Sequence, residues 1–362
     1  MNSQRSPPAL RDHPLGVGRG ARARHLPAEW APQSGVMLTW PHQHSDWAGQ
    51  LEQVEAVYIE LTRCIARREK VLITCLDLDQ CSEVQCRLLR AGVDRHRLDL
   101  RAVPSNDTWT RDHGPLTVRV DGQLRLLDFR FNGWGGKYPA ELDNAITQRL
   151  HADGAFGALQ RDEIDMVLEG GSIEVDGAGT LLTTQRCLLA PTRNPRLGRE
   201  QIERRLIELL GVTRIAWLRY GAIAGDDTDG HIDTLARFCD EKTIVYVADE
   251  SGGGNAELEA MKSELAALRN ADGKPYRLVA LPCPRPIIDS GGQQLPASYA
   301  NFLIINGAVL VPVFGDAADE QALRRIGMCF PAREIIAIDA RALIQQRGGM
   351  HCVAMHLPSG VL

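Results

Sequence analysis

Several short segments of the sequence carry side chains that could do chemistry. The segment 106–115 holds two carboxylates, a histidine and a tryptophan. We expect Asp112 to face a cation and Trp109 to offer a flat ring on which that cation could stack. An apolar core needs none of these side chains, so the competing interpretation is a capping loop with its charges in solvent.

Two further carboxylates lie in short polar segments next to glycines. Glu169 directly follows 166–168, the end of a predicted buried strand, where a carboxylate is costly unless it is paired or functional. The alternative for Glu169 is a cap on local backbone amides. In 225–233, an extended backbone with Ile232 in the core would project His231 and Asp233 together from the opposite face. That pair suits acid–base work or metal binding, and the sequence leaves both open.

The segment 225–233 superficially resembles a calcium-binding loop, but its register is wrong. With Gly230 as the sixth residue, Gly225 and Ala236 occupy positions one and twelve, where Asp and Glu are required. We therefore do not predict a calcium site there.

Cys352 follows Gly348 and Gly349, which allow a backbone to approach a ligand closely. The chain has nine cysteines without CxxC spacing, which is typical of reduced thiols, most of them small buried side chains. Taken alone, Cys352 is therefore either a nucleophile or an ordinary core thiol. If 351–352 is extended, His351 faces away from Cys352, which favours a more distant base.

A repeated module positions these segments. It begins with a hairpin, 116–120 and 124–129, that turns at Asp121-Gly122, and continues with a helix over 140–150 and a strand over 164–168. The same hairpin, helix and strand order recurs in 172–218, 234–281 and 301–338, and 35–103 forms a fifth, more decorated unit. Hairpins about 60 residues apart indicate a repeat architecture. We predict a single-domain α/β propeller of five pseudo-symmetric ββαβ modules, rather than a doubly wound sheet, because strict strand–helix alternation is absent.

The polar segments occupy one place in this repeat. Each follows a closing strand and precedes the next hairpin, at 106–115, 169–172, 225–233 and 347–352. Equivalent positions in a ring converge near its axis, so the spacing predicts that these segments meet in one central pocket.

The bulk composition narrows the function classes. The 362 residues are 44% hydrophobic and 24% charged with a formal net charge of -5, which argues against a nucleic-acid binder and favours a cationic ligand. No stretch has the roughly 18 continuous apolar residues of a membrane span. Residues 1–24 lack the apolar centre of a secretory signal and are predicted to be a disordered arm before one domain over 25–362. We expect a cytoplasmic enzyme.

Together the motifs resemble those of agmatine deiminases and bacterial-type peptidyl-arginine deiminases. The resemblance spans about 27–358 and rests on five motifs in order, which are 106–115, 131–136, 169–172, 229–233 and 348–352. It implies the five-bladed α/β propeller of the guanidine-modifying superfamily, in agreement with the repeat.

The resemblance also implies roles for individual residues. Cys352 is expected to be the nucleophile and His231 the general acid and base. The remaining expected site residues are the guanidinium-binding Asp112 and Asp233, the active-site Glu169, and the substrate-binding Trp109 and Trp134. The family implies no metal or organic cofactor, a small cationic guanidine substrate, no nucleic-acid or membrane partner, and a homodimer. Its reaction would convert agmatine to N-carbamoylputrescine, a step in putrescine and polyamine biosynthesis.

Two departures leave the substrate open. The run 22–29 lacks the Asp of the Asp-Gly-Phe-like sequence that agmatine deiminases carry there, and 347–356 differs from their usual nucleophile motif. Free arginine, peptidyl-arginine or another guanidine therefore stay as alternatives. Two other classes also stay open. One is a metal-dependent hydrolase with ligands His231, Asp233, Asp112 and Glu169, and the other is a non-catalytic polyamine-binding protein.

Overall fold

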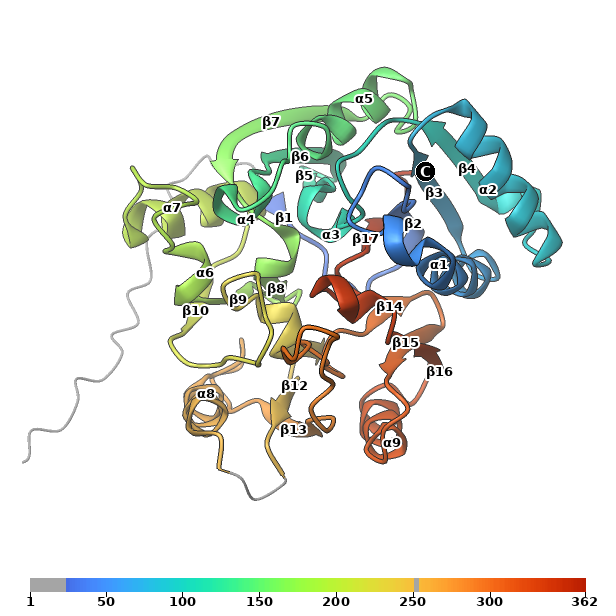
Figure 1. Cartoon of the computed structure of the whole chain (residues 1–362). Helices are drawn as coiled ribbons and strands as arrows, with labels where there is room; N and C mark the ends of the chain where they lie inside the picture. The colour runs from blue at the N-terminus through green and yellow to red at the C-terminus, as the bar shows by residue number, and fades with distance from the viewer. Residues whose placement is uncertain (1–23, 251–253) are drawn as a thin grey trace, which may run out of the picture.

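The computed structural model describes residues 24–250 and 254–362, which form five small sheets around a central axis (Figure 1). Four sheets share one connectivity, in which an antiparallel pair is followed by a helix and then by a strand parallel to the second member of the pair. This is the predicted ββαβ module. Five separate sheets also rule out the doubly wound alternative.

The first module shows why the sequence folds in this way. It comprises β5 (Leu116–Val120), β6 (Gln123–Arg130), α5 (Ile146–Ala152) and β7 (Gln160–Val167), with the short edge strand β1 (Arg24–His25) paired to β5. Asp121 and Gly122 both adopt positive φ, 51° and 84°. A two-residue hairpin with the twist of its strands requires that backbone, and Asp-Gly supplies it.

The next three modules repeat this order. The second comprises β8 (Ile173–Val175), β9 (Thr180–Thr184), α7 (Arg199–Leu210) and β10 (Arg214–Leu218). The third comprises β11 (Ala236–Asp240), β12 (Thr243–Ala248), α8 (Ala256–Ala267) and β13 (Arg277–Pro282). The fourth comprises β14 (Leu303–Ile305), β15 (Ala308–Val313), α9 (Asp319–Cys329) and β16 (Glu334–Asp339). Predicted and observed element ends differ by a few residues.

The fifth module is assembled from both ends of the chain. It holds β2 (Gln33–Thr39), α1 (Leu51–Ala66), β3 (Lys70–Cys75), α2 (Leu78–Arg90) and β4 (Leu98–Ala102). The antiparallel partner of β2 is β17 (Ala354–Pro358), a pairing that the sequence analysis missed. This pairing closes the ring. The predicted arm over 1–24 lies outside the described residues except for Arg24, which belongs to β1.

Apolar packing surrounds a polar axis. Figure 1 shows α1, α2, α7, α8 and α9 on the outside of the ring, where their apolar faces cover the sheets. Nearer the axis, Arg237 is fully buried and pairs with Glu174 and with Glu29, whose carboxylate lies 3.1 Å from Arg237 Nη2. Among the described helices, none is long and apolar enough to cross a membrane.

Candidate active site

The predicted convergence of the polar segments on the axis is present in the structure. The meeting point is the backbone of Gly171, which follows β7 within the 3₁₀ turn Gly170–Ser172. A Cβ placed on Gly171 would lie 2.7 Å from His231 Nδ1, 2.9 Å from Asp112 Oδ1 and 3.0 Å from Asp233 Oδ2. Side chains from two inter-module segments, 106–115 and 225–233, therefore meet the backbone of a third in one space, which any residue other than glycine would fill.

Asp112 lies in the short helix α3 (Thr110–His113) that follows β4. Its two carboxylate oxygens accept hydrogen bonds from the Gly171 backbone N–H at 3.0 Å and from Trp134 Nε1 at 2.8 Å. Burial raises the pKa of Asp112 to about 6, although the charge of His231 acts in the opposite direction. Trp134 has a φ of 54° within a glycine-rich turn, an unfavourable backbone for a bulky side chain. Trp134 thus contacts Asp112 directly, and its indole N–H orients the carboxylate of Asp112.

His231 uses its two ring nitrogens differently. Nε2 lies 3.4 Å from Glu169 Oε2, whereas Nδ1 lies 3.7 Å from Asp112 Oδ1 and has no hydrogen-bond partner among the described residues. Burial disfavours a charged ring, but the carboxylate of Asp112 and contacts with Cys187 and Glu169 outweigh it and hold the pKa of His231 well above its ordinary value. The raised pKa favours the protonated ring, and its Nδ1 lies on the Asp112 side without a hydrogen-bond partner among the described residues.

The expected extended backbone at 231–233 was wrong. Residues Ile232–Thr234 form a 3₁₀ turn, in which Ile232 is fully buried while His231 and Asp233 still both reach the axis. The curvature of this turn, rather than the alternation of side chains along a strand, brings His231 and Asp233 to the same side.

Glu169 is held by partners that the sequence analysis did not find. Arg193 Nε donates to Glu169 Oε1 at 3.0 Å, and the Cys187 thiol donates to Oε2 at 3.5 Å. Burial acts to raise the pKa of Glu169, but His231 and Arg193 outweigh it and lower the pKa. Arg193 lies in an irregular loop with no periodic pattern, so nothing in the sequence signals its burial.

Asp233 is oriented by a chain of buried groups. Its Oδ2 lies 2.8 Å from His351 Nδ1, and His351 Nε2 lies 2.7 Å from Glu29 Oε2. The other oxygen, Oδ1, has no hydrogen-bond partner within 24–250 and 254–362. Burial opposes ionisation, but His351 and His231 outweigh it and lower the pKa of Asp233. Asp233 is thus a carboxylate with one fixed oxygen and one available oxygen.

Cys352 lies in a turn just before β17, so the extended backbone considered for 351–352 was also wrong. Its Sγ lies 3.8 Å from Asp233 Oδ2 and accepts from Asn301 Nδ2 at 3.3 Å. Burial and the charges of Asp233 and Asp112 raise the pKa of Cys352 well above its usual value, so the group is a thiol. Both ring nitrogens of His351 contact carboxylates, which agrees with the preference for a base other than His351.

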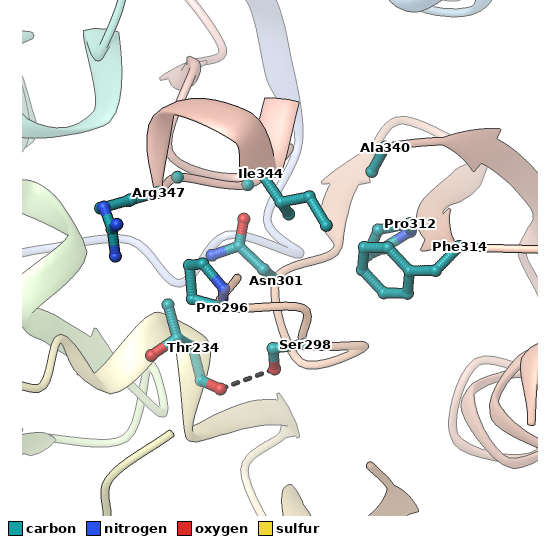
Figure 2. A pocket seen from close by; sticks show the side chains of 11 residues that line it. Thr234, Pro296, Ser298, Asn301, Pro312, Phe314, Ala340, Ile344 and Arg347 are labelled. Carbon is teal, nitrogen blue, oxygen red and sulfur yellow. Dashed lines mark hydrogen bonds between the residues drawn. The ribbon is translucent and has the colours of Figure 1, made fainter. Parts of the chain in front are cut away.

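The two glycines before Cys352 let other side chains lie close to the backbone of the turn. A Cβ on Gly348 would overlap the Trp109 ring, and one on Gly349 would overlap Asn301 Oδ1. Asn301, which sequence reasoning passed over, also accepts from the His351 backbone N–H at 2.8 Å and so fixes the turn. Asn301 also lines a cavity of about 10 Å³, enough for roughly one water. Figure 2 shows the side chains around it.

Trp109 is 5% exposed and lies against Gly348 and Trp47. Its indole N–H donates to Asp107 Oδ2 at 3.0 Å, which fixes the plane of the ring beside the Cys352 turn. The expected function of Trp109 as a substrate wall stays a prediction.

A compact set of possible metal ligands exists, but it differs from the predicted one. Within the described part of the chain, Glu169, Cys187 and His231 place ligand atoms within 4.8 Å of one another. The predicted ligands Asp112 and Asp233 are not members of that set. This arrangement weakens the metal-dependent hydrolase interpretation.

The fold and the site define a class of protein, the five-module α/β propellers with a thiol, an imidazole and carboxylates on the axis. Residues 25–358 match the Porphyromonas-type peptidyl-arginine deiminase family, and the chain belongs to that family. Among sequence relatives, the agmatine deiminase of Stutzerimonas stutzeri (strain A1501) is 34% identical, and the match covers 92% of this chain and 95% of the relative.

Solved structures agree with this assignment. A cysteine-to-serine variant of the C. jejuni agmatine deiminase with substrate bound is 35% identical, with a TM-score of 0.86 over 96% of this chain and 100% of that chain. A Porphyromonas gingivalis protein, provisionally named an arginine deiminase, is 49% identical, with a TM-score of 0.86 over 94% of this chain and 99% of that chain.

Proposed function

We propose that this protein hydrolyses a guanidinium group through a covalent intermediate on Cys352 and releases ammonia. The observation that carries the proposal is the convergence of Asp112, Asp233 and His231 Nδ1 on one point, with Cys352 Sγ 3.8 Å from Asp233. Two carboxylates suit a planar cation, because charge-assisted hydrogen bonds to a guanidinium are strong and directional. The available Oδ1 of Asp233 supplies one such acceptor.

Substrate binding prepares the nucleophile. Asp112 and Asp233 would hold the guanidinium so that its carbon lies within reach of Cys352, which is a positioning contribution to the rate. The bound cation also lowers the pKa of the Cys352 thiol, because a nearby positive charge stabilises a thiolate. The high pKa of Cys352 in the free protein therefore favours activation by the substrate itself.

His231 would then move protons. Cys352 attacks the guanidinium carbon, and His231 Nδ1–H protonates the departing nitrogen as ammonia, which leaves a thiouronium-like intermediate. A water deprotonated by His231 attacks that intermediate, the C–S bond breaks, and the ureido product forms while the thiol is restored. Glu169, fixed by Arg193, holds the imidazole through Nε2 and keeps Nδ1 toward the substrate.

Agmatine is the substrate that the names of the relatives favour. Its deimination by this protein would give N-carbamoylputrescine. Free arginine is the second candidate, because the 49% identical P. gingivalis protein is provisionally named an arginine deiminase. The segments 22–29 and 347–356, which depart from the agmatine deiminase pattern, are the places where a difference in substrate would originate.

The decisive experiment measures release of ammonia and ureido product from agmatine, free arginine and an arginyl peptide, for the wild type and for Cys352→Ala. We expect one compound to be turned over, with turnover abolished and ligand binding retained in Cys352→Ala. Near wild-type activity in Cys352→Ala would refute the covalent mechanism. Binding without turnover in the wild type would favour the polyamine-binding alternative.

Two further proposals concern the assembly and the location of the protein. We infer a homodimer from the family resemblance, and a cytoplasmic location from the composition and the cysteine pattern. Light scattering on the purified chain tests the first, and fractionation of source cells tests the second.

A further inference from the structure

We propose that Glu169, Cys187 and His231 form an inhibitory binding site for a thiophilic divalent cation such as Zn²⁺. All three side chains are fully buried, and their ligand atoms lie within 4.8 Å of one another. Cys187 has no function in the proposed reaction. Metal binding does not depend on the proposed function, whereas inhibition by the metal does.

The distances match the edges of a tetrahedral site. Ligands at normal zinc distances are separated by about 3.4 Å between nitrogen and oxygen, and by about 3.6 Å between oxygen and sulfur. Here His231 Nε2 lies 3.4 Å from Glu169 Oε2, and Cys187 Sγ lies 3.5 Å from the same oxygen. Two of the three edges therefore match, and the third pair of ligand atoms lies within 4.8 Å, so that small side-chain shifts would let one ion contact all three atoms and keep its fourth position open.

The surrounding charges favour a divalent ion. Arg193 binds the other carboxylate oxygen of Glu169, Oε1, so that Oε2 faces Cys187 and His231, the two groups that would coordinate the same ion. Asp112 adds a carboxylate 3.7 Å from the opposite ring nitrogen of His231. With Cys187 as a thiolate, the three negative groups exceed the single positive charge of Arg193, and a thiolate with an imidazole selects a soft or borderline metal.

Coordination would block acid–base catalysis. The metal takes the lone pair of His231 Nε2, so the ring can no longer become an imidazolium, and the protons displaced from Cys187 and His231 pass to solvent. Nδ1 then lacks the acidity needed to protonate a leaving nitrogen. The ion would therefore inhibit without touching Cys352.

Cobalt titration of the chelator-treated full chain tests binding without reference to activity. We expect one equivalent of Co²⁺ to give thiolate-to-cobalt charge-transfer absorption in the wild type and in Cys352→Ala, and none in Cys187→Ala. Cys239→Ala is the matched control, because Cys239 is also buried but neighbours Cys329 rather than a histidine. Circular dichroism checks that each variant is folded. If Cys187→Ala does not fold, Cys187→Ser takes its place in the titration.

Zinc inhibition of the same variants completes the test. Relative to the zinc-free activity of each protein, inhibition by Zn²⁺ should be at least tenfold weaker in Cys187→Ser than in the wild type. Absence of the absorption in the wild type, its persistence in Cys187→Ala, or its loss in Cys352→Ala would overturn the site. A protein inactive on every guanidine but with the expected cobalt spectra would refute the proposed function and leave the metal site standing.

Discussion

Asp112 and Asp233 are both buried carboxylates, yet their partners give them different acidities. Asp233 receives a hydrogen bond from His351, which lowers its pKa, whereas Asp112 is bonded to neutral donors and has a pKa of about 6. At the residue scale, the hydrogen-bond partners therefore decide which carboxylate is protonated first as the pH falls. In the proposed mechanism that carboxylate, Asp112, limits substrate binding.

The rate constant kcat/KM should therefore fall on the acid side of about pH 6. Protonation of Asp112 would remove the charge that is proposed to bind the guanidinium, so the loss should approach about tenfold per pH unit below that value. The raised pKa of His231 keeps its acid form populated above the ordinary histidine range, so activity should persist there. Initial rates measured across the pH range test both the loss of activity on the acid side and its persistence on the alkaline side. A flat profile to about one unit below the pKa of Asp112 would contradict the assignment.

At the scale of elements, the turn before β17 depends on the absence of side chains. Gly348→Ala would force the turn away from Trp109, and a displacement of about 1 Å at Cys352 should lower kcat by about 10²-fold. Gly49→Ala is the control, because Gly49 has no neighbouring atom within 4 Å of its Cβ position and no positive φ. Equal rates for the two variants would show that the turn tolerates displacement.

Glu29 joins several elements by charge. Its carboxylate accepts from the Ile304 N–H of β14 and pairs with Arg237 of β11, with His351 and with Arg111 of α3. Glu29→Gln should lower the free energy of unfolding by about 3–5 kcal/mol, because it leaves buried cations uncompensated.

Urea unfolding measures that loss. Glu60→Gln, which removes a partly exposed pair with Arg63, should cost only about 0–1 kcal/mol. If Glu29→Gln lowered the free energy of unfolding by no more than Glu60→Gln does, the buried network around Glu29 would add no stability.

At the scale of the whole molecule, the pairing of β17 with β2 joins the two ends of the ring. Leu357 in β17 is fully buried, so Leu357→Ala should lower the free energy of unfolding by about 2–5 kcal/mol. Because β2 belongs to the same sheet, we expect one cooperative transition rather than local loss of β17. Urea denaturation followed by two probes tests this expectation. Leu78→Ala is the control, because the Leu78 side chain is 73% exposed. Two separated transitions would contradict a ring that unfolds as one unit.

The sequence by itself determined the repeat, the fold class and the segments that meet at the axis. Asp121-Gly122 and the recurring hairpin, helix and strand order are local signals, because turn geometry and apolar spacing act over a few residues. Cys352, His231, Glu169, Asp112 and Asp233 were predicted as site residues from their place at equivalent ends of modules and from the resemblance of their motifs to a family, and the structure brings them close together.

Only the tertiary structure decided what each of these groups contacts. The pairing of β2 with β17, the contact of Arg193 with Glu169, and the chain from Asp233 through His351 to Glu29 join residues far apart in sequence. No local pattern encodes them, because burial, hydrogen bonding and acidity depend on which side chains the closed ring brings within a few ångströms. The chemistry can therefore be located from the sequence, whereas the acidities that govern it arise from packing around the axis.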